Sequence, residues 1–191
     1  MVIKMTKIDI ESLKSEDIKQ ELSRIKYKSK FSSILRSTIY VLITLIALGT
    51  IIATFLTPII QINTNSMSPK YNTGDVVVTL KTKNIKKGDI IAFYHGNKII
   101  VSRVIGLSGE YISIDSKGII SINGEKQKEE YATNIDKELD DIKYPHQVSS
   151  SSYFVLNDDR EYLNDSRNKE IGDIKSEDLI GKLIFKIWSK K

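Results

Sequence analysis

Residues 39–60 read IYVLITLIALGTIIATFLTPII, a run of 22 residues without a charged side chain. A helix needs about 20 apolar residues to cross a bilayer, whereas a core helix of a soluble domain is usually shorter and keeps a polar face. A cleaved secretory signal has an apolar region of only about 7 to 15 residues, close to the N-terminus. The stretch therefore predicts one transmembrane helix, which divides the chain into a segment before it and a domain after it.

The segment before this stretch carries most of the net charge. Residues 1–38 hold nine Lys or Arg against five Asp or Glu, which is +4 of the chain's +5. Positive charge before a span favours a cytoplasmic N-terminus, which puts residues 61–191 outside the cell. Residues 8–30 have apolar side chains at roughly helical spacing, typical of a surface helix near lipid headgroups. A lipid bilayer is therefore an expected partner, and a nucleic acid is not.

The part after the stretch has short apolar runs that are rich in β-branched residues and separated by turn residues. The predicted strands are residues 75–80, 89–94, 99–105, 111–114, 119–122, 153–156 and 183–188. Turn sequences such as Asn123-Gly124 favour tight hairpins between neighbouring strands. Residues 125–150 are polar without clear periodicity, which predicts an insertion or a mobile loop. The predicted fold is mainly β, with a β-rich outer domain at residues 61–191 on a single N-terminal transmembrane helix. The chain has no Cys, so disulfides and Cys-based metal sites are excluded.

A short polar stretch, Asn65-Ser66-Met67-Ser68-Pro69, lies between the predicted span and the first predicted strand. A lone Ser in a polar loop is usually a turn residue, because a hydroxyl needs a base to become a nucleophile. Further sequence blocks follow this stretch in order. They read KGDIIAF at 87–93, RVIGLSGE at 103–110, ING at 122–124, and YFVLNDDR at 153–160 continued by DSR at 165–167.

Together these five blocks resemble the type I signal peptidase family, the bacterial Ser/Lys-type leader peptidases. That family has a Ser-Met-x-Pro motif, a Gly-Asp-hydrophobic-Phe strand, an Arg-Val-Ile-Gly segment, a hairpin block and a Tyr-Phe-Val-x-Gly-Asp-Asn-Arg block. The resemblance runs from the predicted span to the end of the chain. It implies a signal-peptidase-type β domain, no cofactor or metal, and signal peptides of exported precursors as partners.

The resemblance also assigns roles to single residues. Ser66 takes the place of the nucleophile, and Thr64, two residues earlier, is an oxyanion donor or a plain strand-edge residue. The family's general base is a neutral Lys directly before the Arg of the Arg-Val-Ile-Gly segment, and that position is Ser102. The family's Ser that contacts this Lys corresponds to Leu163. The chain is therefore identified as an atypical member without the usual catalytic Lys.

Several other residues are candidates for the general base. Lys98 has the strand parity of Ser102, but lies four residues earlier, about 13 Å along a strand. His95 is a suitable residue type and is expected in a solvated turn. The remaining candidates are Tyr94, Lys81 and Lys83.

The last block is rich in acidic and basic residues. It contains Asp158, Arg160, Asp165 and Arg167. Acidic clusters attract hard cations, but arginines alongside favour salt bridges. The resemblance gives these residues a structural role, while Asn157 and Asp159 replace a Gly and an Asn of the family's pattern.

Two hypotheses of function follow. The first is a membrane-anchored serine endopeptidase that removes signal peptides, with Ser66 as nucleophile and an unidentified base. The second is a silent homologue that binds peptides as an assembly or chaperone factor, for example in pilus biogenesis. The intact Ser-Met-x-Pro motif favours the first, which is our prediction, and the missing Lys favours the second. A self-cleaving repressor domain with a Ser/Lys pair is disfavoured by the span. The Lys/Ile/Asn-rich composition suggests a low-GC Gram-positive bacterium.

Overall fold

The computed structural model describes residues 3–134 and 141–189, with side chains from residue 16 onward. The chain forms two compact units, Met1–Ala53 and Thr54–Lys191. All described residues of the first unit are helical, and the second unit holds all the described strands.

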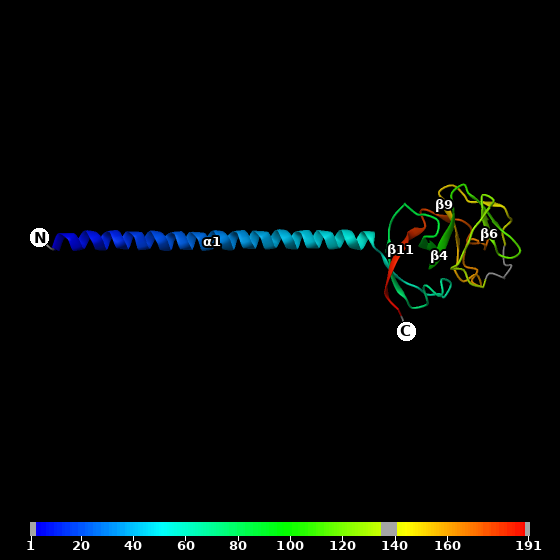
Figure 1. The fold of residues 1–191 in the computed structure, drawn as a ribbon, viewed down its shortest axis with the longest axis horizontal. Coiled ribbons are helices and arrows are strands. Elements are labelled where there is room, and N and C mark those ends of the chain that lie inside the picture. Colours follow the sequence, from blue (N-terminus) through cyan, green and yellow to red (C-terminus); the bar gives the residue numbers. More distant parts are fainter. Residues whose placement is uncertain (1–2, 135–140, 190–191) are drawn as a thin grey trace. The chain divides into compact units, whose positions relative to one another are not determined.

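Helix α1 spans Ile3–Leu56 as one continuous helix (Figure 1). Its part from Glu16 to Leu56 is long and apolar enough to cross a membrane, and none of that window is buried against protein. The apolar stretch at residues 39–60 continues past the end of this helix. The helix ends at Leu56 because Pro58 has no backbone N–H to continue the ladder and restricts the residue before it. The prediction of a helix reaching residue 60 was thus wrong by four residues, and residues 59–61 form a strand instead.

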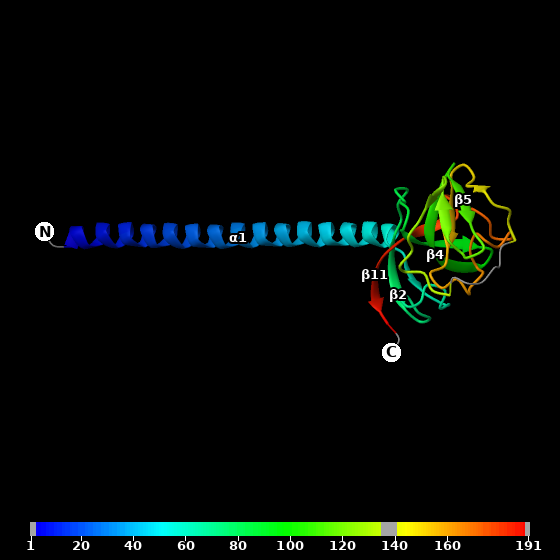
Figure 2. The same cartoon turned by 45° about the vertical axis from the view of Figure 1, so that its right-hand side comes forward.

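Seven antiparallel strands form the larger sheet of the second unit, in the order β1-β2-β11-β3-β4-β9-β10. Their bounds are β1 Ile59–Gln61, β2 Val76–Leu80, β11 Leu179–Trp188, β3 Ile90–His95, β4 Lys98–Leu107, β9 Ser152–Leu156 and β10 Ile174–Lys175. The last strand, β11, pairs with both β2 and β3, and Figure 2 shows β11 beside β2. β2 and β3 are therefore not a hairpin, although they follow each other in the chain.

The smaller sheet has four strands in the order β7-β6-β5-β8. They are β7 Glu125–Lys126, β6 Ile120–Ile122, β5 Tyr111–Ile114 and β8 His146–Gln147. Asn123 and Gly124 join β6 to β7 with φ angles of 51° and 85°, as a tight two-residue hairpin turn requires. The predicted loop at residues 125–150 thus contributes two short strands, while residues 135–140 lie outside the described part.

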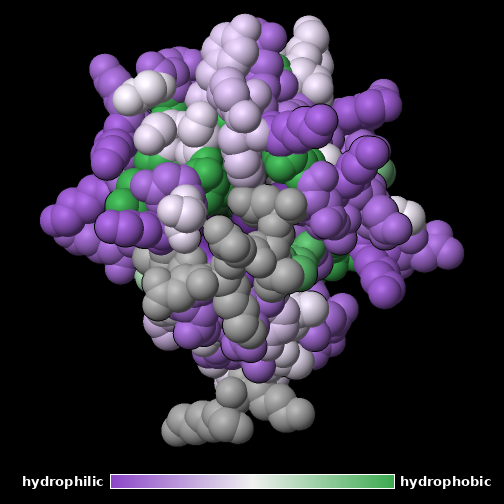
Figure 3. Space-filling model, turned by 90° about the vertical axis from the view of Figure 1, so that its right-hand side faces the viewer, coloured by the Kyte–Doolittle hydropathy of each residue, from purple (hydrophilic) through white to green (hydrophobic). Residues whose placement is uncertain are grey.

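All seven predicted strands are present, with bounds shifted by a few residues, so the mainly β fold is confirmed. Residues of β4 from Ile100 to Gly106 are buried without interruption, because both faces of this central strand are covered. The face of the β unit seen in Figure 3 is mainly hydrophilic, with small separate apolar patches. The strands that carry the predicted site residues therefore lie inside a well-packed domain.

Candidate active site

Ser66 lies in the loop between β1 and β2, and the next residue fixes its position. Met67 is fully buried in a cluster with Ile62, Val77 and Ile90, so the loop is held by its apolar side chain. The carbonyl oxygen of Ser66 also accepts a hydrogen bond of 3.0 Å from the backbone N–H of Asp159. The loop is thus attached to the segment that follows β9.

The Ser66 hydroxyl has a hydroxyl partner and no basic one. Its Oγ lies 2.9 Å from Thr64 Oγ1, and the residue is only 1% exposed. Among the described residues, no Lys, His or Arg nitrogen forms a hydrogen bond with this oxygen. The structure therefore brings Thr64 to Ser66, but it brings no base.

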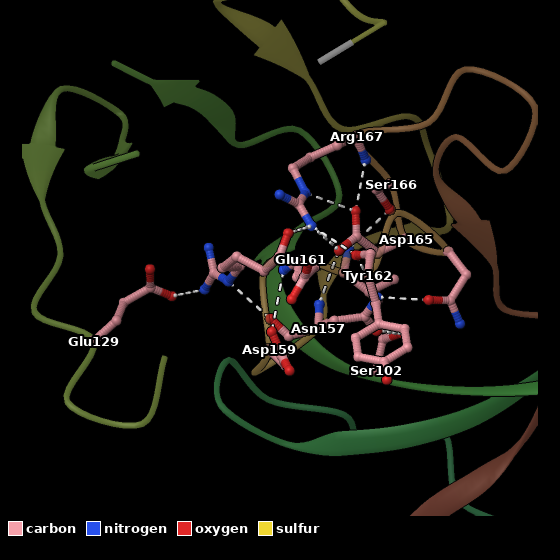
Figure 4. Close-up of polar contacts among 12 residues, drawn as sticks. Ser102, Glu129, Asn157, Asp159, Glu161, Tyr162, Asp165, Ser166 and Arg167 are labelled. Atoms are coloured by element: carbon pink, nitrogen blue, oxygen red, sulfur yellow. Dashed lines mark hydrogen bonds and ion pairs between the residues drawn. The ribbon is translucent and has the colours of Figure 1, made fainter. Parts of the chain in front are cut away.

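Ser102 lies on β4 and is fully buried. Its Oγ donates a hydrogen bond of 2.8 Å to Asn157 Oδ1, so the two residues face each other, as Figure 4 shows. The side-chain nitrogen of Asn157 donates to the carbonyl oxygen of Tyr162 at 3.0 Å and to Asn164 Oδ1 at 2.9 Å. The side chain at the position of the family's Lys is thus bonded to a neutral amide, whose other side-chain bonds are also to neutral groups.

The neighbouring pair, Arg103 and Asp158, is charged. Arg103 binds both carboxylate oxygens of Asp158, with its Nε at 2.7 Å from Oδ1, and also donates to the carbonyl oxygen of Gly88. Its guanidinium carbon lies 3.9 Å from the centre of the Tyr131 ring. Burial alone would lower the pKa of Arg103, but the hydrogen bond and charge of Asp158 raise it, so the ion pair stays charged.

A second set of ion pairs supports the turn after β9. Arg167 binds the carboxylate of Asp165 and also donates to the carbonyl oxygens of Arg160 and Tyr162, as seen in Figure 4. Asp165 Oδ2 accepts from the backbone N–H of Asn157 at 3.0 Å. In the described part of the chain no group of three or more His, Cys, Asp or Glu residues is placed to hold a metal ion. These residues therefore form a structural scaffold.

A groove of about 930 Å³ lies beside Thr64. Its lining includes Thr64, Leu163, His95, Lys98 and Ile99. Two candidate bases, His95 and Lys98, thus share this groove with Thr64 and the residue at the position of the family's second Ser. Lys81 and Lys83 line a different cavity of about 490 Å³. Tyr94 is exposed on β3, and none of these side chains forms a hydrogen bond with Ser66 among the described residues.

Asn157 is the residue whose importance the sequence reasoning missed. The motif comparison identified it only as a replacement of Gly that weakens the last block. A signal was available in the sequence, because three positions of the family's pattern differ in this chain: Asn157 replaces a Gly, Ser102 a Lys and Leu163 a Ser. Residues in contact affect one another's energies, so three such replacements together indicate that these residues are neighbours. The structure shows the contact between two of these three residues.

The fold and the site define the class of this protein. The chain combines a mainly antiparallel β domain, a Ser-Met-x-Pro loop and an N-terminal helix long and apolar enough to cross a membrane, which are the features of the signal peptidase class. Residues 35–188 match the family described as signal peptidase, peptidase S26, and since this match covers most of the chain, the protein belongs to that family.

Similar proteins come from species of Staphylococcus, Streptococcus and Enterococcus. An inactive signal peptidase IA of Staphylococcus aureus (strain Mu50 / ATCC 700699) is 30% identical over 137 residues, covering 65% of this chain and 75% of that protein. A signal peptidase I of Streptococcus pneumoniae serotype 4 is 25% identical over 168 residues, covering 68% of this chain and 81% of that protein. The crystal structure of a signal peptidase I from Enterococcus faecalis V583 shares 27% identity, covers 53% of this chain and 98% of that one, and gives a TM-score of 0.43.

Proposed function

We propose that this protein is a membrane-anchored signal peptidase homologue that binds signal peptides of exported precursors and does not cleave them. The observation that carries this proposal is the set of partners at the catalytic positions. The Ser66 hydroxyl is bonded to the Thr64 hydroxyl, and Ser102 is bonded to the neutral amide of Asn157. The proposal thus prefers the second of the two sequence hypotheses.

The chemistry of the nucleophile supports a silent site. A serine hydroxyl attacks a carbonyl only when a base accepts its proton. Thr64 supplies a hydroxyl, which is not a base at neutral pH. His95 and Lys98 are exposed at the groove and form no hydrogen bond with Ser66. Thr64 is then a hydrogen-bonding partner of Ser66 and not an oxyanion donor in use.

The groove supports peptide binding. It combines apolar residues, such as Ile99 and Leu163, with polar ones, such as Asn164, as peptide sites usually do. Thr64, which lines the groove, follows the last helical residue, Leu56, by only eight positions in the sequence. The expected ligands are therefore precursors held in the same membrane. We place residues 1–38 in the cytoplasm, the helical residues 39–56 in the bilayer and the β domain from residue 59 onward outside. A silent peptide binder there suits an assembly or chaperone role.

The relative from Staphylococcus aureus adds support, because its name describes an inactive signal peptidase. The relative from Streptococcus pneumoniae is named as a signal peptidase I without that qualification. Membership of the family is therefore compatible with both hypotheses, and the partners at the catalytic positions of this chain support the second.

The test uses the full chain in lipid vesicles with a secreted precursor. We expect wild type and Ser66→Ala to bind the precursor alike and to leave it uncut. Leu163→Asp places a charge in the groove and should weaken binding at least about tenfold, while Ile119→Asp, a matched change at an exposed apolar residue directly before β6, should not. Cleavage by wild type that disappears in Ser66→Ala would establish an active peptidase instead. His95 and Lys98 would then be the first residues to substitute.

A further inference from the structure

The turn at residues 162–164 forms one wall of the groove. Behind this turn lies the buried pair of Ser102 and Asn157, and the pair and the turn together form a cluster. Ser102 and Asn157 are both fully buried. The proposed function uses only the fact that no base is present there. The cluster has a geometry of its own, and this geometry connects the former catalytic position to the surface that binds peptide.

The first part of this geometry is the direction of the side chain at position 102. Its Oγ points at Asn157 Oδ1 from 2.8 Å. A longer side chain at this position leaves the backbone in the same direction and meets the Asn157 amide. Protein interiors hold few voids larger than a water molecule, so such a side chain has no room while Asn157 is present. Asn157 therefore occupies the space that a longer residue at position 102 needs.

The second part is the way Asn157 holds the turn. Its Nδ2 donates to the carbonyl oxygen of Tyr162 and to the side chain of Asn164, the two residues on either side of Leu163. Residues 162–164 all line the groove. Both N–H groups of one buried amide thus fix the turn that forms a wall of the groove.

We propose that Asn157 is a positioning residue for peptide binding: together with Ser102 it fills the former catalytic space and holds the turn that presents Leu163 to the groove. The part concerning the bound peptide rests on the proposed function. Ser102 stands where the family has its base, and Leu163 stands where the family has the Ser that contacts this base. The amide of Asn157 connects these two positions. The groove accordingly accepts an apolar peptide side chain at Leu163.

The claim about space is tested by a double-mutant cycle on the purified full chain. The variants are Ser102→Lys, Asn157→Gly and the double variant. Ser102→Lys alone should lower Tm by about 5 °C or more, because a buried amine is forced against the amide. The double variant should be more stable than the sum of the single losses predicts, since Asn157→Gly opens the space. As a control, Asn84→Gly in an exposed loop should combine additively with Ser102→Lys. Additive losses for Asn157→Gly as well would overturn the claim.

The claim about the turn is tested by hydrogen exchange of the backbone amides in residues 162–166. Asn157→Asp keeps an acceptor for Ser102 but removes both donors to the turn, so exchange there should accelerate about tenfold or more. Ser102→Ala leaves these two donors in place and should change exchange in the turn less than twofold. Equal exchange in Asn157→Asp and wild type would overturn the positioning role.

Peptide affinity completes the test. Asn157→Asp should weaken binding of a signal peptide about fivefold or more, while Val148→Ala, a destabilising change in the core of the smaller sheet, should stay within twofold of wild type. A purely structural role would instead make affinity follow Tm in both variants. The double-mutant cycle and the hydrogen-exchange measurement are made without peptide. They therefore test the role of Asn157 in packing and in holding the turn even if the wild-type protein cleaves precursors. A cleaving wild type therefore defeats the proposed function alone.

Discussion

Two adjacent pairs of residues connect β4 to the segment after β9, and they differ in charge. Arg103 and Asp158 form a buried ion pair, while Ser102 and Asn157 form a neutral hydrogen bond one residue away. The Arg and Asp of the family's sequence blocks are present in this chain as Arg103 and Asp158. Where the family has its catalytic base, this chain has a residue that satisfies a buried neighbour. The difference shows that the supporting residues of a site can stay the same while the residue at a catalytic position changes.

The strongest test of this comparison is to remove the charged pair. Arg103→Met leaves the buried carboxylate of Asp158 without its partner, and breaking such a pair costs about 3–5 kcal/mol. The free energy of unfolding from urea titration should fall by that amount. The double variant Arg103→Met/Asp158→Leu should recover part of the loss. A loss below about 1 kcal/mol would mean that the two pairs contribute alike, which contradicts the comparison.

The neutral pair should give a smaller effect. Asn157→Ala leaves the buried Ser102 hydroxyl without its partner and removes one of the two donors to the Tyr162 carbonyl, the other being Arg167, at a cost of about 1–3 kcal/mol. Ser102→Ala should cost about 1 kcal/mol, because the amide keeps its other two bonds. The same urea titration measures both. If Ser102→Ala costs as much as Asn157→Ala, the bond to Ser102 and not the bonds to the turn dominates the cluster.

The pH dependence of stability should separate charged from neutral contacts. Burial by itself would raise the pKa of Asp75, but hydrogen bonds from Lys186, the Asn72 backbone and Ser189 lower it below its ordinary value of 3.8. A carboxyl with a lowered folded pKa stabilises the fold fully above the unfolded pKa, and this contribution is lost as the pH falls through the folded pKa. The stability difference between wild type and Asp75→Asn should therefore shrink below pH 3.8.

The corresponding control is the neutral pair. The stability difference between wild type and Ser102→Ala should stay constant over the same acidic range in thermal unfolding, because neither Ser102 nor Asn157 titrates there. A change of that difference with pH would show that the Ser102–Asn157 side-chain bond depends on the charge of Asp165, which accepts from the Asn157 backbone N–H.

The smallest effect is expected at the surface. Lys87 Nζ lies 2.7 Å from Glu110 Oε1, but the Lys side chain is 45% exposed. Exposed ion pairs contribute about 0–1 kcal/mol, so Lys87→Ala should change the free energy of unfolding by less than that. Added salt should reduce the effect further. A loss comparable to that of Arg103→Met would show that burial is not what distinguishes the charged pair.

The amino-acid sequence by itself was enough to predict the class of fold, to locate the loop that holds Ser66, and to show that Ser102 stands at the position of the family's Lys. Short β-branched runs between turn residues identify strands, because side-chain alternation and turn chemistry are local properties. Ser66 and Ser102 were recognised from the order of blocks along the chain. The end of the helix was misplaced, because the apolar run continues into β1 and composition alone does not separate helix from strand at that point.

Only the tertiary structure decided which residues meet. The insertion of β11 between β2 and β3 depends on pairing between distant segments, which no local pattern contains. Ser102 and Asn157 are 55 positions apart, and their contact follows from the pairing of β4 with β9. The same long-range pairing separates Lys81 from the groove and brings Lys98 to it. Strand identity is local, whereas the neighbours of a buried side chain are set by the whole fold.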